Sequence, residues 1–151
     1  MRAINHALTG ALIGLTVSEP AMALPAALAS HYVLDMIPHH GAAKPDVKSL
    51  RSKYFKLSLI VDAILCAVLV GILARYHPLH WLLAAVCAFV AASPDFISYR
   101  RYRAAQNHRS WRPNLYENFA HRIQWFEHPI GAAVEVAWLL AAWFLLAPFI
   151  S

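Results

Sequence analysis

The feature that most constrains this chain is a set of apolar segments long enough to cross a membrane. Residues 129–150 form a run of 22 residues with one charged side chain, Glu135. Residues 3–34 contain one acidic residue, two His and no Lys or Arg. Charged residues make up only 14% of the 151-residue chain, whereas a typical soluble domain has roughly 25%. The sequence therefore predicts an all-α, polytopic membrane helix bundle that forms a single domain over residues 1–151.

Breaks in the apolar segments predict about five spans. A single helix over residues 3–34 would be about 48 Å long, whereas the hydrocarbon core of a bilayer is about 30 Å thick. We therefore expect Ser18-Glu19-Pro20 to divide it, because Ser favours the cap and Pro the first turn of a helix. The predicted spans cover residues 3–18, 20–36, 56–75, 79–92 and 129–150.

A further helix is predicted over residues 115–127, outside the spans. Leu115, Phe119, Ile123 and Phe126 recur there at three- or four-residue spacing, which is typical of an amphipathic helix. Because Arg and Trp residues flank this segment, we expect it to lie at the membrane surface, with Asn114 as its cap.

The Lys and Arg residues are divided unequally between the two sides of this arrangement. With the N-terminus in the cytoplasm, twelve of the thirteen lie on the cytoplasmic side and only Arg75 lies outside. This is the positive-inside distribution, so it predicts a cytoplasmic N-terminus and an external C-terminus. The pI near 9.5 then reflects basic loops that face anionic lipid. Membrane lipid is the expected partner, and no specific nucleic-acid binding is expected.

Side chains that bind metals gather at the expected cytoplasmic ends of the spans. Residues 31–40, HYVLDMIPHH, hold three His and one Asp, and His31 and Asp35 share a helix face because they are four residues apart. Imidazole combined with carboxylate suits Zn, Mn or Fe better than Ca or Mg. We therefore expect one or two divalent transition-metal ions, with zinc as the first choice. The candidate ligands are His6, His31, Asp35, His39, His121 and His128.

Two further residues are candidates for catalysis and substrate binding. Asp95 lies at the cytoplasmic end of the fourth predicted span, where it is a candidate ligand or general base. Arg122 is a candidate for binding a substrate phosphate. Two-metal sites activate water and clamp phosphoryl oxygens, and a site of this kind is open to this residue set.

Two other classes of function stay open on the residues alone. Asp62 and Glu135 lie inside predicted spans, where they pair with a polar partner, line a water path or act in catalysis. In a metal-ion or proton transporter they would form sites in the middle of the membrane. In a non-catalytic membrane adaptor, the basic loops would recruit lipid or a cytosolic partner. The absence of an inverted repeat counts against the transporter.

Several short motifs carry a resemblance to a known family. Asn5-His6, the segment from His31 through Asp35 to His39, and His121-Arg122 followed by His128 resemble the small bacterial inner-membrane metal-dependent hydrolases, the group that includes the LexA-binding inner-membrane-associated hydrolases. The chain departs from that pattern because Ile123 replaces a Gly and no Thr-His-Ser follows. The family is distantly similar to the all-helical zinc phospholipase C and P1 nuclease group. The resemblance implies phosphoester hydrolysis, on a phospholipid or lipid-linked substrate, at a bacterial inner membrane.

Overall fold

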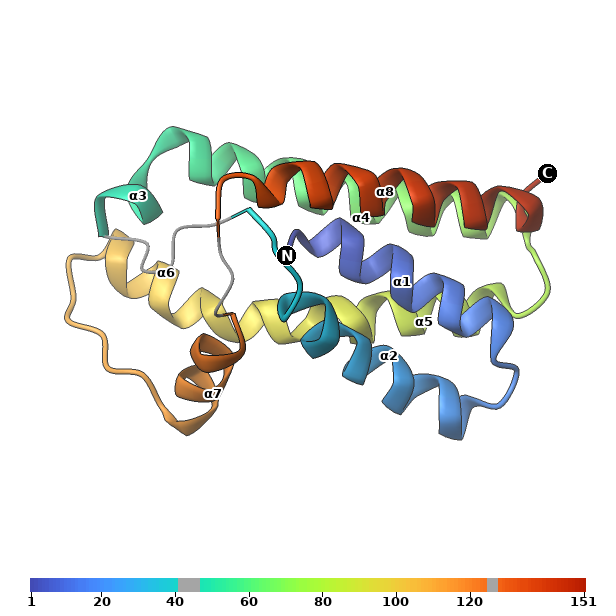
Figure 1. Cartoon of the computed structure of the whole chain (residues 1–151), viewed down its shortest axis with the longest axis horizontal. Helices are drawn as coiled ribbons and strands as arrows, with labels where there is room; N and C mark the ends of the chain where they lie inside the picture. Colours follow the sequence, from blue (N-terminus) through green and yellow to red (C-terminus); the bar gives the residue numbers. More distant parts are fainter. Residues whose placement is uncertain (41–46, 125–127) are drawn as a thin grey trace.

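The computed structural model describes residues 1–40, 47–124 and 128–151, and this part of the chain is helical without β-strands (Figure 1). The all-α prediction is therefore confirmed. The elements are α1 (Ala3–Thr16), α2 (Pro20–Asp35), α3 (Val47–Arg51), α4 (Lys53–Tyr76), α5 (Trp81–Ala92), the 3₁₀ helix η1 (Ser93–Ser98), α6 (Tyr99–Gln106), α7 (Leu115–Ile123), α8 (Gly131–Leu146) and the 3₁₀ helix η2 (Ala147–Phe149).

Three helical segments are long and apolar enough to cross a membrane. They are Lys53–Tyr76, Trp81–Gln106 and Gly131–Phe149. By contrast, α1 and α2 have 14 and 16 residues, fewer than the ~20 residues that a span usually needs. The predicted break is present, because α1 ends at Thr16 and α2 begins at Pro20. The predicted Ser cap is wrong, because the N-cap of α2 is Glu19 and its side chain makes no capping hydrogen bond.

The α-helix of the predicted fourth span ends at Ala92, as expected, but the chain remains helical beyond this residue. Residues 93–98 continue as η1, and α6 extends the same helical segment to Gln106. Pro94 lies in the first turn of η1, where its missing N–H breaks few hydrogen bonds. The expected loop after the span is therefore partly helical.

The amphipathic helix predicted over 115–127 is present as α7, which ends at Ile123. Residues 125–127 of that prediction, including Phe126, lie outside the described residues. Asn114 caps α7 as expected, since its Oδ1 accepts a hydrogen bond of 2.8 Å from the backbone N–H of Glu117. The Glu117 carboxylate in turn accepts a bond of 2.7 Å from the Asn114 N–H, completing a capping box.

Small residues bring α1 and α5 into close contact. A Cβ atom added at Gly10 would lie 2.3 Å from the carbonyl oxygen of Cys87, and one added at Gly14 would lie 2.5 Å from the Cα atom of Ala84. Only glycine permits this approach, and the Gly-x-x-x-Gly spacing is typical of closely packed membrane helices. Because His6 lies one turn before Gly10 on the same helix, this contact positions the site described below.

Arg2 connects the start of α1 to α4 and α8. Its Nε atom donates a hydrogen bond of 3.0 Å to Oδ1 of Asp62, and its backbone N–H donates one of 2.9 Å to Oε1 of Glu135. The Asn5 side chain adds a bond of 3.1 Å to the Glu135 carbonyl oxygen. Asp62 and Glu135 thus have polar partners, which is one of the uses that the sequence left open. In Figure 1, α1 starts near the middle of the long axis of the molecule.

Candidate metal centre

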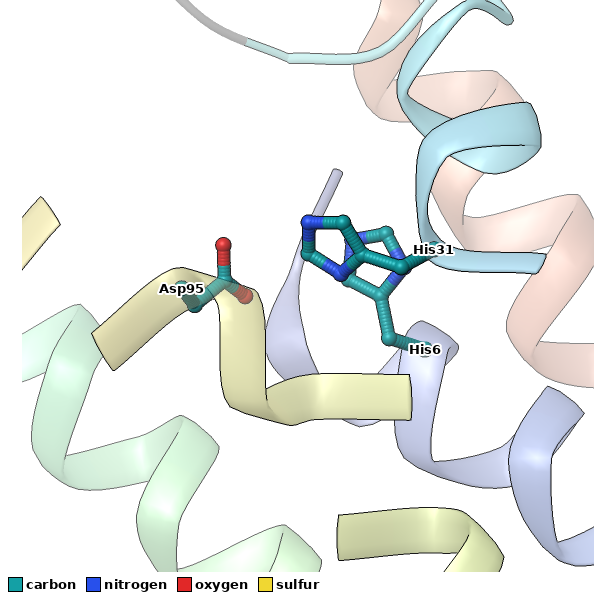
Figure 2. Close-up of side chains that lie close together, drawn as sticks. All are labelled: His6, His31 and Asp95. Carbon is teal, nitrogen blue, oxygen red and sulfur yellow. The ribbon is translucent and has the colours of Figure 1, made fainter. Parts of the chain in front are cut away.

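Three side chains from separate elements converge at the start of α1. His6 lies on α1, His31 near the end of α2 and Asp95 in η1 (Figure 2). One ligand atom from each residue lies within 4.8 Å of the other two. Among the described residues, these three side chains are thus close enough together to hold a metal ion. The two imidazoles are stacked with ring centroids 4.0 Å apart. Both histidines are buried, and Asp95 is half-buried.

The interruption at η1 is what brings Asp95 to this site. Ser93 donates its hydroxyl hydrogen to the carbonyl oxygen of Val90 (2.9 Å), and Pro94 provides no N–H for the next turn. The chain therefore tightens into a 3₁₀ helix over residues 93–98, a conformation that is uncommon in the middle of a long helix and often marks a functional position.

His31 has the hydrogen-bonding pattern of a metal-binding histidine. Its Nδ1 atom lies 2.8 Å from the carbonyl oxygen of Ala91, and a carbonyl can only accept, so Nδ1 carries the hydrogen. In the neutral imidazole Nε2 then presents a lone pair. Histidines that bind metals commonly donate their other ring N–H to a backbone carbonyl in this way.

His6 is fully buried and its polar atoms are left without hydrogen bonds. Neither Nδ1 nor Nε2 has a hydrogen-bond partner among the described residues. Nε2 does lie 3.3 Å from Oδ1 of Asp35, but without the alignment of a hydrogen bond. Because buried polar atoms are almost always paired, a ring with two unpaired nitrogens fits a position where a ligand completes the coordination. The residues present therefore fit a metal ion.

Asp35 lies between the two histidines and is itself almost fully buried. Its Oδ1 atom pairs with the Met1 amino group and faces His6. Its Oδ2 atom lies 3.3 Å from Nε2 of His31 and accepts a hydrogen bond of 2.9 Å from the side-chain amide of Gln124. When His31 is protonated, this contact is an ion pair. When His31 is neutral, two acceptors face each other, and a cation between them would relieve the repulsion.

The other predicted ligands lie outside the group of three. His39 is buried, and its Nδ1 donates a hydrogen bond of 2.8 Å to the carbonyl oxygen of Ile37. Its own carbonyl oxygen accepts one of 3.1 Å from the backbone N–H of His128, so these two predicted ligands are neighbours through the backbone. The His128 side chain is exposed, and its Nδ1 accepts from the N–H of Ile130 (3.2 Å).

His121 and Arg122 are exposed on α7. Nε2 of His121 accepts a hydrogen bond of 3.1 Å from the guanidinium of Arg101. The structure thus directs His121 toward α6 rather than toward His6 and His31. Arg122 lies two residues before Gln124, the residue whose amide reaches Asp35. The C-terminal end of α7 is therefore next to the site.

A tyrosine pair also joins α7 to α2. The hydroxyl groups of Tyr32 and Tyr116 lie 3.3 Å apart, and Phe119 packs edge-on against Tyr32. Burial and the hydrogen bond to Tyr32 raise the pKa of the Tyr116 phenol above its usual value, so it stays neutral and can donate at physiological pH.

His6, His31 and Asp95 were all candidates from the sequence, but two of the groups that contact the site residues were not. The carbonyl of Ala91 and the amide of Gln124 were both missed, because nothing in the local sequence distinguishes them. A signal was available for the α1–α5 contact, since Gly10 and Gly14 form a Gly-x-x-x-Gly pattern in an apolar helix. No model of a known protein family, no curated protein and no solved structure matches this chain.

Proposed function

We propose that this protein is a membrane-bound, metal-dependent hydrolase that cleaves a phosphoester. The observation that carries the proposal is the convergence of His6, His31 and Asp95, with ligand atoms within 4.8 Å of one another. Two imidazoles and one carboxylate are the ligand set of several catalytic zinc sites, which keep a further position open for water. When bound, a zinc-type ion would supply Lewis-acid activation of water and of a phosphoryl oxygen.

The proposed roles of the surrounding residues follow from their contacts. The Ala91 carbonyl would orient His31 through its Nδ1–H. Asp35 faces Nε2 of both histidines, so its carboxylate would bind the ion beside them. Asp95 has two carboxylate oxygens, so it would bind the ion with one and accept a proton from water with the other. Arg122, an exposed residue of α7 two positions before Gln124, would bind the negatively charged phosphate of the substrate. His39 and His128 are joined by a backbone hydrogen bond, and they would be the candidate ligands of a second ion.

The proposed location is a bacterial inner membrane with the N-terminus in the cytoplasm. Three segments would cross the bilayer, and α1 and α2 would form a shorter inserted hairpin, which keeps five membrane segments in total. The bias of Lys and Arg residues supports this orientation. The motif resemblance to inner-membrane metal-dependent hydrolases supports the same location and a phospholipid or lipid-linked substrate.

The hydrolase is favoured over a transporter by the contacts of the two acids inside the spans. Asp62 and Glu135 both accept hydrogen bonds from Arg2, so they would need to break these bonds to bind a transported ion. Flux into vesicles that contain the protein separates the two proposals. A transporter would lose flux when both acids are neutralised, whereas a hydrolase would have no flux to lose.

Elemental analysis of the detergent-purified protein tests the proposal directly. We expect close to one equivalent of a transition metal in the unaltered chain. His6→Ala and His31→Ala should each lose most of it, whereas His40→Ala, an exposed neighbour of the site residues, should keep it. Hydrolysis of bis(p-nitrophenyl) phosphate should follow the metal content. A folded protein that purifies without metal and binds none on addition of zinc would rule the proposal out.

A further inference from the structure

A second concave site lies at the basic end of the molecule, away from His6 and His31. It is a pocket of about 210 Å³ between α3, α6 and the segment that follows α6. Leu50 and Ala105, both buried, contribute an apolar wall. Arg101, Arg109, Ser110 and Trp111 contribute the polar part of the lining.

The pocket is held in place by contacts between its walls. The side-chain amide of Gln106 donates a hydrogen bond of 3.0 Å to the carbonyl oxygen of Leu50, which joins α6 to α3. The guanidinium of Arg101 lies 5.1 Å from the ring centroid of Trp111, and the indole N–H of Trp111 donates to Glu117 at the start of α7 (3.3 Å). Arg101 is therefore oriented by its neighbours, which lowers the entropy cost of binding a ligand.

The two segments that form most of the pocket carry charge of one sign. Residues 47–56 and 99–112 together contain nine Lys and Arg residues and no Asp or Glu. α3 leads into the candidate span Lys53–Tyr76, and α6 ends the candidate span Trp81–Gln106. The pocket thus lies where two apolar segments end, which is where lipid headgroups lie in a membrane.

From this combination we propose that the pocket binds the phosphate headgroup of an anionic membrane lipid. Arg101 and Arg109 would contact the phosphate and Ser110 would donate to one of its oxygens. The apolar wall at Leu50 and Ala105 would contact the start of the acyl chains. A free phosphate ion has no apolar part that could contact this wall. Basic pockets at the cytoplasmic ends of membrane helices are typical lipid headgroup sites.

Native mass spectrometry of the full chain in detergent tests this assignment. The probes are phosphatidylglycerol, phosphatidylcholine with the same acyl chains, and inorganic phosphate. We expect Arg109→Gln to weaken phosphatidylglycerol binding about fivefold, and Arg101→Gln with Arg109→Gln to weaken it about thirtyfold. Arg100→Gln is the matched control, because Arg100 is exposed and next to Arg101 but does not line the pocket. It should change binding less than about twofold.

Three results would overturn the proposal. Equal losses in Arg100→Gln and Arg109→Gln would mean diffuse attraction to the basic surface. Equal binding of phosphatidylcholine would remove the role of the negative headgroup. Displacement of the lipid by an equal concentration of inorganic phosphate would assign the pocket to the free ion. Arg109 is exposed, so Arg109→Gln is expected to fold, which its circular dichroism and melting temperature verify. If the double variant is unstable, the test rests on this single variant.

Discussion

The Nε2 atom of His6 lies 3.3 Å from Oδ1 of Asp35, although the two residues come from different helices and His6 has no hydrogen bond among the described residues. This contact joins the start of α1 to the end of α2 inside the bundle. The other carboxylate oxygen is equally close to Nε2 of His31. One carboxylate oxygen of Asp35 therefore faces each of the two imidazoles.

Replacing Asp35 by Asn should weaken metal binding by at least roughly 10–100-fold, because it removes a negative charge that faces Nε2 of both histidines. Competition with a chromophoric zinc chelator measures the affinity. Glu19→Gln is the control, because it neutralises an exposed carboxylate at the start of α2. An unchanged zinc affinity in folded Asp35→Asn protein would show that this carboxylate acts only through its ion pair with Met1.

The two sets of candidate ligands can be separated by alanine variants. His6→Ala should remove the bound metal, because His6 is a buried member of the group of three. His121→Ala and His128→Ala should retain more than half of it, because both side chains are exposed. Metal content after dialysis gives the answer. If the unaltered protein instead holds two equivalents of metal and His128→Ala loses one of them, His128 binds a second ion.

The contact between α1 and α5 predicts opposite effects for two glycine substitutions. Gly10→Ala should lower stability by about 1–3 kcal/mol, because the added Cβ would clash with the backbone at Cys87. Gly71→Ala should be neutral or stabilise the protein by up to about 1 kcal/mol, since nothing lies within 4 Å of the new atom and Ala favours helix. Thermal unfolding in detergent compares them. Equal melting temperatures would contradict the close packing of α1 on α5.

The bond between Arg2 and Asp62 should contribute to stability through its charge. Its two groups are 3.0 Å apart, and the Asp62 side chain is only 14% exposed. Arg2→Gln and Asp62→Asn should each destabilise the protein, and the double variant should lose less than their sum by about 0.6 kcal/mol. Chemical unfolding of the four proteins in detergent completes the cycle. Strictly additive losses would mean that the two side chains do not interact.

Much of the local structure was predictable from the sequence. The predicted helix 56–75, the start of the predicted helix 115–127 and the break at Ser18-Glu19-Pro20 correspond to observed helices and helix ends. They were predictable because apolar runs, caps and prolines act within a few residues. His6, His31 and Asp35 were expected to meet because they lie at the cytoplasmic ends of two predicted spans that cross the membrane in opposite directions. The contacts His6–Asp35 and His31–Asp35 agree with it.

What the tertiary structure decided is the pairing between segments distant in sequence. The approach of Gly10 to Cys87, the hydrogen bond from His31 to the Ala91 carbonyl and the exposed positions of His121 and His128 depend on how helices rotate and slide against one another. Apolar periodicity carries little of that information in a chain whose helices are apolar on nearly every side. The sequence by itself therefore determined the helices and the residue types of the site. The packing of small residues between α1 and α5 determined which of those residues meet, because backbones can approach this closely in only one register.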